Sequence, residues 1–155
     1  MTTRTATLED AAALAELNHH VHDIHVEAEP ERYSVTDDAA VAEQFRMFIR
    51  GVATEVLLAE RGGVAIGYVV VVGVERPAQA FAHARRWALV DQIAVAPHAR
   101  RTGVGRALMD AAAQSARRRG YPELQLDVRA HNKGARAFYE SLGYRVAQSR
   151  MQKSV

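Results

Sequence analysis

One stretch in the second half of the chain restricts the fold more than any other: Q-I-A-V-A-P-H-A-R-R-T-G-V-G-R-A-L, which starts at Gln92. Its first residues complete an apolar strand pattern over Trp87–Val95, and Pro97 ends that pattern. A glycine-rich turn then opens an amphipathic helix over Gly103–Arg119. Consecutive backbone N–H groups at such a helix N-terminus, together with the helix dipole, favour the binding of a phosphate group.

Two common nucleotide-binding patterns do not fit this turn. No Gly-Lys-Ser/Thr follows it, which excludes a P-loop, and Leu108 stands where a dinucleotide fingerprint has its third glycine. A glycine-rich turn is weak evidence on its own. The alternative, a tight entry into a helix without any ligand, stays open at this point.

The chain of 155 residues is expected to form a single domain, 1–155, in which short strand patterns alternate with helical ones. This mixture indicates an α/β or α+β fold. Thr7 and Asp10 approximate a capping box before the first helix, which continues into a group of histidines. The predicted order is β-α-α-β-β-β-α-β-α-β, with strands at 4–6, 56–60, 65–74, 87–95, 124–128 and 144–147, later helices at 36–50, 103–119 and 133–142, and a long loop at 75–86.

Composition narrows the functional classes. The chain has no cysteine, which excludes disulfides, thiolate metal sites and cysteine nucleophiles. It has no apolar run near the roughly 20 residues that span a bilayer, and its N-terminus lacks the apolar centre of a signal peptide, so we expect a cytoplasmic protein with no membrane partner. The formal net charge is only +2, but arginines cluster in the second half. Such clusters indicate either an anionic ligand or a solvated basic face.

Two motifs together resemble the GNAT superfamily of acetyl-CoA-dependent N-acetyltransferases. In the first, quoted above, Arg100, Gly103 and Gly105 match the family's cofactor-binding signature. The second is L-D-V-R-A-H-N-K-G-A-R-A-F-Y-E-S-L-G-Y, with an asparagine before a helix and a tyrosine before S-L-G-Y. The resemblance covers Trp87–Val146 well, and the preceding residues through the order of their elements. It implies the GNAT fold: an α/β domain with a mostly antiparallel central sheet, a splayed parallel strand pair and four flanking helices.

The same resemblance implies that acetyl-CoA is the co-substrate and that no metal takes part. Backbone amides of the turn would hold the pyrophosphate, while Ile93 and Val95 would pair with the pantetheine and the thioester carbonyl, which a backbone N–H would polarise. The expected cofactor residues are Ile93, Ala94, Val95, Arg100, Arg101, Thr102, Gly103, Val104, Gly105, Arg106, Asn132, Arg136 and Tyr139.

Tyr139 matches the tyrosine that protonates the departing thiolate in many family members. A phenol with a pKa of about 10 holds its proton at neutral pH and can donate it. The alternative is a packing role, because Phe138 and Leu142 lie on the same helical stripe. Asn132 matches a cofactor contact in the family, yet an asparagine before a helix is also an ordinary N-cap.

Two aspartates are candidates for the general base. Asp127 aligns with an acidic position of some ribosomal-protein-type acetyltransferases, although aspartate is one methylene shorter than the more usual glutamate. Asp91 interrupts the apolar face of the strand Trp87–Val95, and a β-bulge there would turn it toward the cleft. A structural role is the alternative for each.

The first half contains N-H-H-V-H-D-I-H, which starts at Asn18. His19, His22 and His25 are spaced to share one side of a helix and could bind zinc, but the chain lacks an H-E-x-x-H motif and exposed histidine-rich helix ends are common. The resemblance favours another reading, because the connection between the first two helices forms the acceptor wall in GNAT proteins. The candidate acceptor contacts are His25, Glu27, Glu29 and Tyr33, whose acid groups would suit a cationic amine. A solvated helix end is the alternative.

The predicted function is therefore transfer of acetyl from acetyl-CoA directly to a primary amine of a small molecule or a peptide. The acceptor itself is not identified by the sequence. A non-catalytic acyl-CoA-binding module is the first alternative. A nucleic-acid-binding module is the second and is not expected, because the basic residues lie around the phosphate-binding turn with few aromatic residues among them. Many relatives dimerise, so a homodimer is expected.

Overall fold

The computed structural model describes all residues from Met1 to Val155 and confirms a mixed α/β fold. Five strands form one sheet in the order β1-β2-β3-β4-β5, antiparallel except for the last pair, β4 and β5. Short 3-10 turns at 8–10 and 97–99 precede α1 and α3. The elements are β1 Thr2–Thr5, α1 Ala11–Ala28, α2 Asp38–Arg50, β2 Thr54–Arg61, β3 Val64–Arg76, β4 Arg85–Val95, α3 Val104–Arg118, β5 Leu124–Leu126 and α4 Lys133–Ser141.

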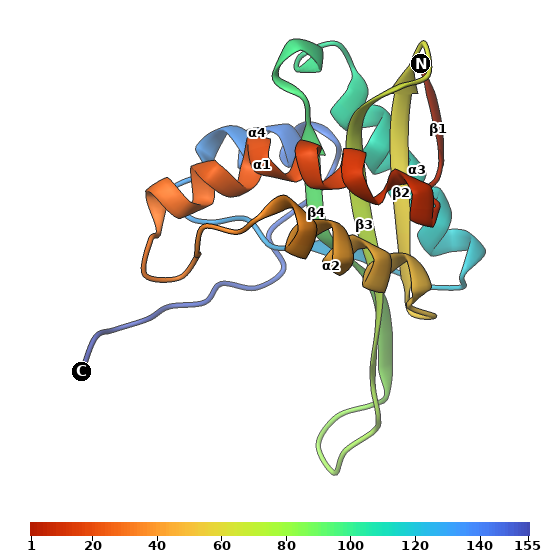
Figure 1. The fold of residues 1–155 in the computed structure, drawn as a ribbon. Coiled ribbons are helices and arrows are strands. Elements are labelled where there is room, and N and C mark those ends of the chain that lie inside the picture. Colours follow the sequence, from red (N-terminus) through yellow and green to blue (C-terminus); the bar gives the residue numbers. More distant parts are fainter.

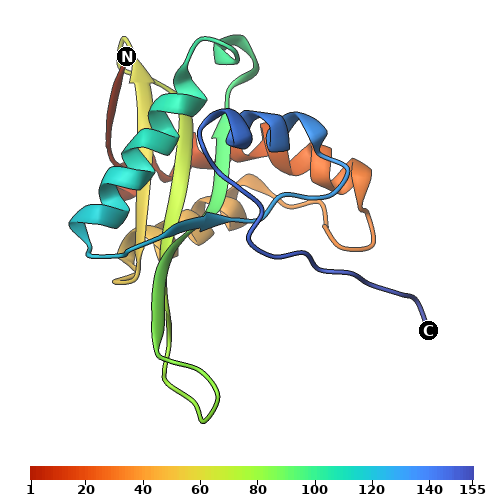
Figure 2. The same ribbon diagram turned by 180° about the vertical axis from the view of Figure 1, so that it is seen from behind.

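Helices cover both faces of the sheet. In Figure 1 α1 and α2 lie in front of it, and Figure 2 shows α3 and α4 on the opposite face. The central strand β3 is buried from Ile66 to Val71 because it has helices on both faces and strands on both edges. None of the helices combines the length and the apolar character that crossing a bilayer requires.

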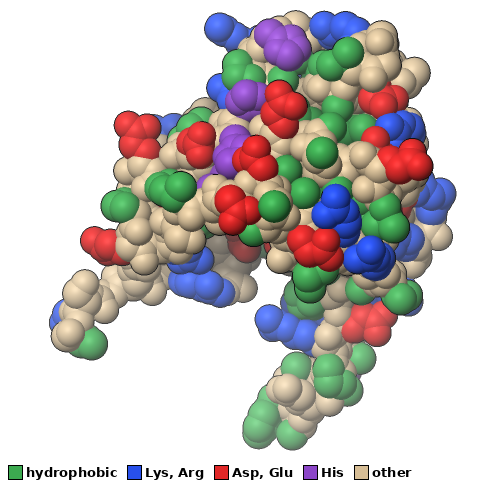
Figure 3. Space-filling model, in the orientation of Figure 1, with side chains coloured by type: hydrophobic (Ala, Val, Ile, Leu, Met, Phe, Trp, Pro, Cys, Tyr) green, Lys and Arg blue, Asp and Glu red, His purple; other side chains and the backbone are tan.

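The predicted loop over Glu75–Arg86 is wrong. The strands β3 and β4 continue pairing as far as Arg76 and Arg85, so that only 77–84 connect them. The guanidinium groups of Arg76 and Arg85 lie 5.3 and 5.5 Å from the centre of the Trp87 ring. This cation–π stacking stabilises the extended backbone at both arginines, although their sequence is typical of a loop. The resulting arm projects beyond the sheet (Figure 1), and hydrophobic side chains, including the fully exposed Phe81, cover much of its tip (Figure 3).

The predicted strand at 144–147 is also wrong, and β5 ends at Leu126 rather than at Val128. The chain turns at Gly143, which has a φ of +88°, and the N–H of Tyr144 donates to the carbonyl of Tyr139. This bond draws the chain back to the end of α4 instead of along the sheet. The C-terminal residues then run away from the domain (Figures 1 and 2), and β5 remains the edge strand.

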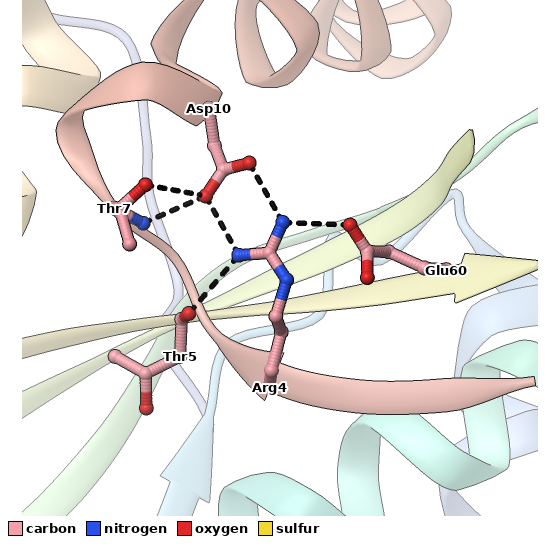
Figure 4. Close-up of polar contacts among 5 residues, drawn as sticks. All are labelled: Arg4, Thr5, Thr7, Asp10 and Glu60. Atoms are coloured by element: carbon pink, nitrogen blue, oxygen red, sulfur yellow. Dashed lines mark hydrogen bonds and ion pairs between the residues drawn. The ribbon is translucent and has the colours of Figure 1, made fainter. Parts of the chain in front are cut away.

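Three N-terminal elements are joined through one arginine (Figure 4). Arg4 on β1 donates to both carboxylate oxygens of Asp10 at 2.8 Å, and to Glu60 on β2 at 2.6 Å. The bond from Arg4 is the main reason that the pKa of Asp10 falls to about 2. Asp10 also accepts from the backbone N–H of Thr7 at 2.7 Å, which confirms the predicted cap at the start of the first helical segment.

Gly67 sets the position of α3 on the sheet. A Cβ atom at this position would lie 2.8 Å from the carbonyl oxygen of Ala94, and 3.1 and 3.2 Å from the side chains of Leu108 and Val104. The first turns of α3 therefore pack on bare backbone where β3 and β4 pair. Because Val104 is the first residue of α3, this contact fixes where the helix N-terminus lies relative to β4.

We expect Gly67→Ala to lower the free energy of unfolding by about 1–3 kcal/mol, because the added methyl group meets backbone that cannot move away freely. Thermal or urea denaturation measures the change. The matched control is Gly134→Ala in α4, where a Cβ would meet nothing within 4 Å. Alanine there gains helix propensity, so its stability should be equal or higher. Equal midpoints for the two variants would contradict the close contact at Gly67.

Candidate functional site

The two parallel strands part after a short pairing, as predicted. Ala88–Val90 pair with Leu124–Leu126, after which β5 ends and β4 continues to Val95. From Asp91 onward, β4 therefore has a strand neighbour only on its β3 side. Unpaired backbone N–H and C=O groups along such an edge can bond to an extended ligand. Ile93, Ala94 and Val95, three of the predicted cofactor residues, lie on this edge.

A β-bulge lies where the strands part. Val70 of β3 pairs with Gln92 and Val71 pairs with Val90, so Asp91 is the extra residue on β4. The bulge predicted at Asp91 is thus confirmed, and the Asp91 side chain is exposed. Asp127 is exposed as well and is the first residue after β5. One candidate base therefore lies on β4 and the other directly after the end of β5, at the two borders of the opening.

The glycine-rich turn has the backbone that an anion-binding helix entry needs. Gly103 has a φ of +88° and Arg101 a φ of +59°, a left-handed conformation that side-chain-bearing residues rarely adopt. A Cβ at Gly103 would meet nothing within 4 Å, so its backbone is open to a ligand. The first amides of α3 have no acceptor inside the helix, and this helix is 15 residues long. The turn therefore has the free backbone amides that an anionic group such as a phosphate needs.

Side chains of the turn divide into two groups. Arg100 donates to the carbonyls of Val95 at 3.2 Å and His20 at 3.4 Å, so it joins β4 to α1. Thr102 donates to the carbonyl of Ala99 at 2.7 Å and stabilises the turn. The side chains of Arg101 and Arg106, by contrast, are exposed beside the helix entry. These two arginines are the ones placed to add positive charge there.

Gly105 brings α4 against α3. A Cβ at Gly105 would lie 3.2 Å from Cζ of Phe138, so the second glycine of the motif allows helix packing. Tyr139 follows Phe138 and is half-buried, with its ring 6.0 Å from that of Tyr144. Burial raises the pKa of Tyr139 above its ordinary value, which favours the protonated phenol at neutral pH.

The remaining two cofactor candidates have partners within α4. Asn132 is the N-cap, because its side-chain oxygen accepts from the N–H of Ala135 at 3.0 Å. The side-chain amide N–H groups of Asn132 are not used by this cap. Arg136 donates to Glu140 at 2.8 Å on the exposed face of the helix. Both residues lie at or near the start of α4.

Three of the four predicted acceptor residues form a cluster that joins α1 to the segment after β5. The rings of His25 and Tyr33 stack at 5.2 Å, and Arg129 donates to the Tyr33 hydroxyl at 3.1 Å. Glu29 lies 3.5 Å from the guanidinium of Arg129. Burial is the main cause that lowers the pKa of His25. Glu27 is exposed on α1 and is not part of the cluster.

The other histidines point to separate partners rather than to a common centre. His19 lies 2.5 Å from a carboxylate oxygen of Asp38 at the start of α2, and His22 lies 2.7 Å from the carbonyl oxygen of Ser34. In the structure no three histidine or carboxylate side chains come together as a set that could hold a metal ion. The histidines instead fasten α1 to the chain that leads into α2.

One polar group near the opening was missed in the sequence. Asn18 donates to the hydroxyl of Tyr68 at 2.8 Å and to Gln92 at 3.3 Å, and the Tyr68 hydroxyl also lies 3.2 Å from Gln92. The sequence carried one signal: Asn18 follows the apolar positions Leu14 and Leu17 of the buried face of α1. A polar residue next to such a stripe needs a partner inside the protein.

Comparison with known proteins agrees with this geometry. The family model described as the acetyltransferase (GNAT) family matches residues 18–144, from the middle of α1 to just beyond α4. The chain belongs to the GNAT acetyltransferase family. The matched part contains the opening between β4 and β5, the glycine-rich turn and Tyr139.

Individual GNAT relatives differ in how much of the chain they match. The uncharacterized N-acetyltransferase YhfO of Bacillus subtilis (strain 168) is 31% identical over 145 residues, 93% of this chain and 89% of its own length. The [ribosomal protein bS18]-alanine N-acetyltransferase of Escherichia coli (strain K12) is 47% identical over 58 residues, 37% of this chain and 39% of its own. A crystal structure of a mutant BH1408 protein from Bacillus halodurans superimposes with a TM-score of 0.93 at 25% identity, over 100% of this chain and 99% of that chain.

We expect the pKa values of His19 and His25 to lie on opposite sides of the ordinary value of 6.5. The hydrogen bond to Asp38 is the main cause that raises the pKa of His19, whereas burial lowers that of His25. Because the folded pKa of His19 is raised, its pair with Asp38 stabilises the fold below pH 6.5, and this contribution is lost as the pH rises through the folded pKa. Histidine ring resonances followed by NMR through a pH titration give both values.

Asp38→Asn should lower the pKa of His19 and leave that of His25 unchanged. The matched control is Asp23→Asn, because Asp23 lies farther from His19, at 3.7 Å, and contributes less to the shift. A His19 pKa that does not respond to Asp38→Asn would contradict the contact between α1 and α2.

Proposed function

We propose that the chain is an acetyl-CoA-dependent N-acetyltransferase that transfers acetyl directly to a primary amine of a small molecule or a peptide. The observation that carries the proposal is the opening between β4 and β5 beside the N-terminus of α3. An extended pantetheine would bond along the free edge of β4, while its pyrophosphate meets the amides of the turn. Support for a peptide acceptor comes from the bS18-alanine N-acetyltransferase that matches part of the chain.

The proposed reaction has two proton transfers. Acetyl-CoA supplies the acetyl group and the thiol leaving group. The neutral amine nitrogen forms a bond to the acetyl carbon as the C–S bond breaks, and a backbone N–H of β4 between Ile93 and Val95 polarises the carbonyl. A carboxylate, Asp91 or Asp127, takes the amine proton directly or through a water molecule. Tyr139 gives its phenolic proton to the sulfur and regains one from solvent.

The basic experiment measures binding and turnover separately. Acetyl-CoA should raise the melting temperature, because a ligand that binds only the native state stabilises it. A panel of amines should then release free thiol from acetyl-CoA. A rise in melting temperature without thiol release from any amine would favour an acyl-CoA-binding protein that is not an enzyme.

A homodimer and a cytoplasmic location stay predictions, and sedimentation analysis tests the first.

Tyr139→Phe should lower kcat by about 10²- to 10⁴-fold, the usual contribution of a general acid, with little change in acetyl-CoA affinity. The reason is that phenylalanine keeps the packing against Phe138 but has no proton to donate. Steady-state kinetics and calorimetric titration of the cofactor measure the two quantities. The control is Tyr144→Phe, which removes the neighbouring phenol. Equal turnover in the two variants would show that Tyr139 is not the acid.

Asp91→Asn and Asp127→Asn distinguish the two candidate bases. The variant that removes the base should lose about tenfold or more in kcat/KM. In its plot of kcat/KM against pH, the fall at low pH that protonation of the carboxylate causes should be absent. The other variant should keep the wild-type profile and so acts as the matched control. Wild-type profiles in both variants would exclude a carboxylate base on these two strands.

A further inference from the structure

A pocket of about 310 Å³ lies between α1 and α2 above the sheet. Its apolar wall belongs mainly to α2. Phe45, which forms part of this wall, is almost fully buried, with 1% of its surface exposed, and its ring meets that of Phe48 edge-on at 6.0 Å. The hydrophobic residues that line the pocket are Ala40, Val41, Phe45 and Phe48.

The floor of the pocket connects it to the opening between β4 and β5. Gln92 lines the pocket and is also the residue after the bulge at Asp91, on the part of β4 that has no β5 neighbour. The side chain of Gln92 bonds to Asn18, a second lining residue, so it points toward α1. A molecule seated in the pocket would therefore lie beside the strand edge at which acetyl transfer is proposed.

The polar groups of the pocket carry no fixed charge. They belong to Asn18, His22, Thr36, Gln44 and Gln92, and no Asp, Glu, Lys or Arg lines the pocket. The hydroxyl of Thr36 is buried and has no hydrogen-bond partner. Buried polar groups are usually paired, so Thr36 is an exception in the structure, and the groups that face the pocket are the side-chain amides of Asn18, Gln44 and Gln92.

Charge is arranged differently outside the pocket. Asp and Glu side chains are spread over the face formed by α1 and α2, and basic side chains lie among them on one side (Figure 3). Asp23 and Glu27 on α1 and Asp38 at the start of α2 are exposed and acidic, whereas Arg46 and Arg50 of α2 are paired with Glu43. An acidic surface attracts a protonated amine, whereas a neutral, partly apolar cavity disfavours the burial of a charge that it cannot pair. The matching ligand is an amine with one uncharged apolar side chain and neighbouring neutral hydrogen-bonding groups.

Building on the proposed function, we propose that this pocket selects the acceptor by binding the apolar side chain of an amino-terminal residue of a peptide. The side chain packs against Val41, Phe45 and Phe48. The peptide amide bonds to the free side-chain oxygen of Asn18 or the free side-chain N–H groups of Gln92, and the α-amine is left at the edge of β4. Polycationic amines are poor acceptors, because each would bring an unpaired charge to a neutral cavity.

The test uses leucyl-glycinamide, glycyl-glycinamide and spermidine as acceptors for the full chain with acetyl-CoA. The first two differ only in one side chain, so the ratio of their kcat/KM values measures how strongly the pocket favours a leucine side chain. We expect about tenfold or more in favour of leucyl-glycinamide, the fold-change that corresponds to burial of one such side chain. Equal use of the two peptides, or a preference for spermidine, would overturn the proposal.

Two alanines on α2 give a matched pair of variants. Ala40 lines the pocket and Ala39 does not, and both are exposed, so phenylalanine at either position leaves the core intact. Ala40→Phe should fill the cavity and bring the ratio between the two peptides close to one, whereas Ala39→Phe should keep the wild-type ratio. Melting temperature and acetyl-CoA affinity should be the same in both variants. An unchanged ratio in Ala40→Phe would overturn the proposal.

Calorimetric titration of leucyl-glycinamide without acetyl-CoA separates this inference from the proposed function. If no amine yields free thiol, the transferase proposal fails, and binding that is lost in Ala40→Phe but kept in Ala39→Phe still supports the pocket. If thiol is released but leucyl-glycinamide binds equally to both variants, the transferase proposal stands and the pocket proposal fails.

Discussion

Backbone hydrogen bonding of β4 ends on one side after Val90, where β5 stops. A strand in the middle of a sheet normally has partners on both edges, so the free edge beyond this point needs water, another element or a ligand. The chain places no further strand there. It places a helix entry with unpaired amides at one end of the gap and two aspartates beside it. The arrangement of the site thus follows from one missing stretch of strand pairing.

Helix α1 connects the two sides of this gap. On the β4 side, Asn18 bonds to Gln92, and the carbonyl of His20 accepts from Arg100. On the other side, the connection after α1 meets the segment after β5 through Tyr33 and Arg129. The sheet is open here, but α1 is bonded to one border and the connection after α1 to the other. A site of this kind can admit an extended molecule without losing the relative positions of its walls.

Sequence patterns predicted the features that depend on local chemistry. The glycine-rich turn and the helix caps are properties of a few adjacent residues, and the structure contains each of them. The bulge at Asp91 was suggested by the family resemblance, and the register of β4 against β3 contains it. The strand residues at the base of the arm were predicted as loop, because they are stabilised by stacking of Trp87 with one arginine on each strand and not by a local sequence pattern. The pocket was missed for a similar reason, since Asn18, Phe45 and Gln92 are far apart in the chain. Contacts of this kind depend on tertiary packing and leave no local pattern.

Gly73 has a mechanical consequence for the arm. A Cβ at this position would overlap the hydroxyl of Tyr121, at 1.9 Å, so that ring stands directly on the β3 backbone where the arm leaves the sheet. The ring is itself held between the guanidinium groups of Arg86 and Arg119, at 4.8 and 5.2 Å. The base of the arm is thus supported from one side by an aromatic ring that two arginines hold in place. A side chain larger than hydrogen at position 73 would displace this ring and so disturb the sheet where the arm begins.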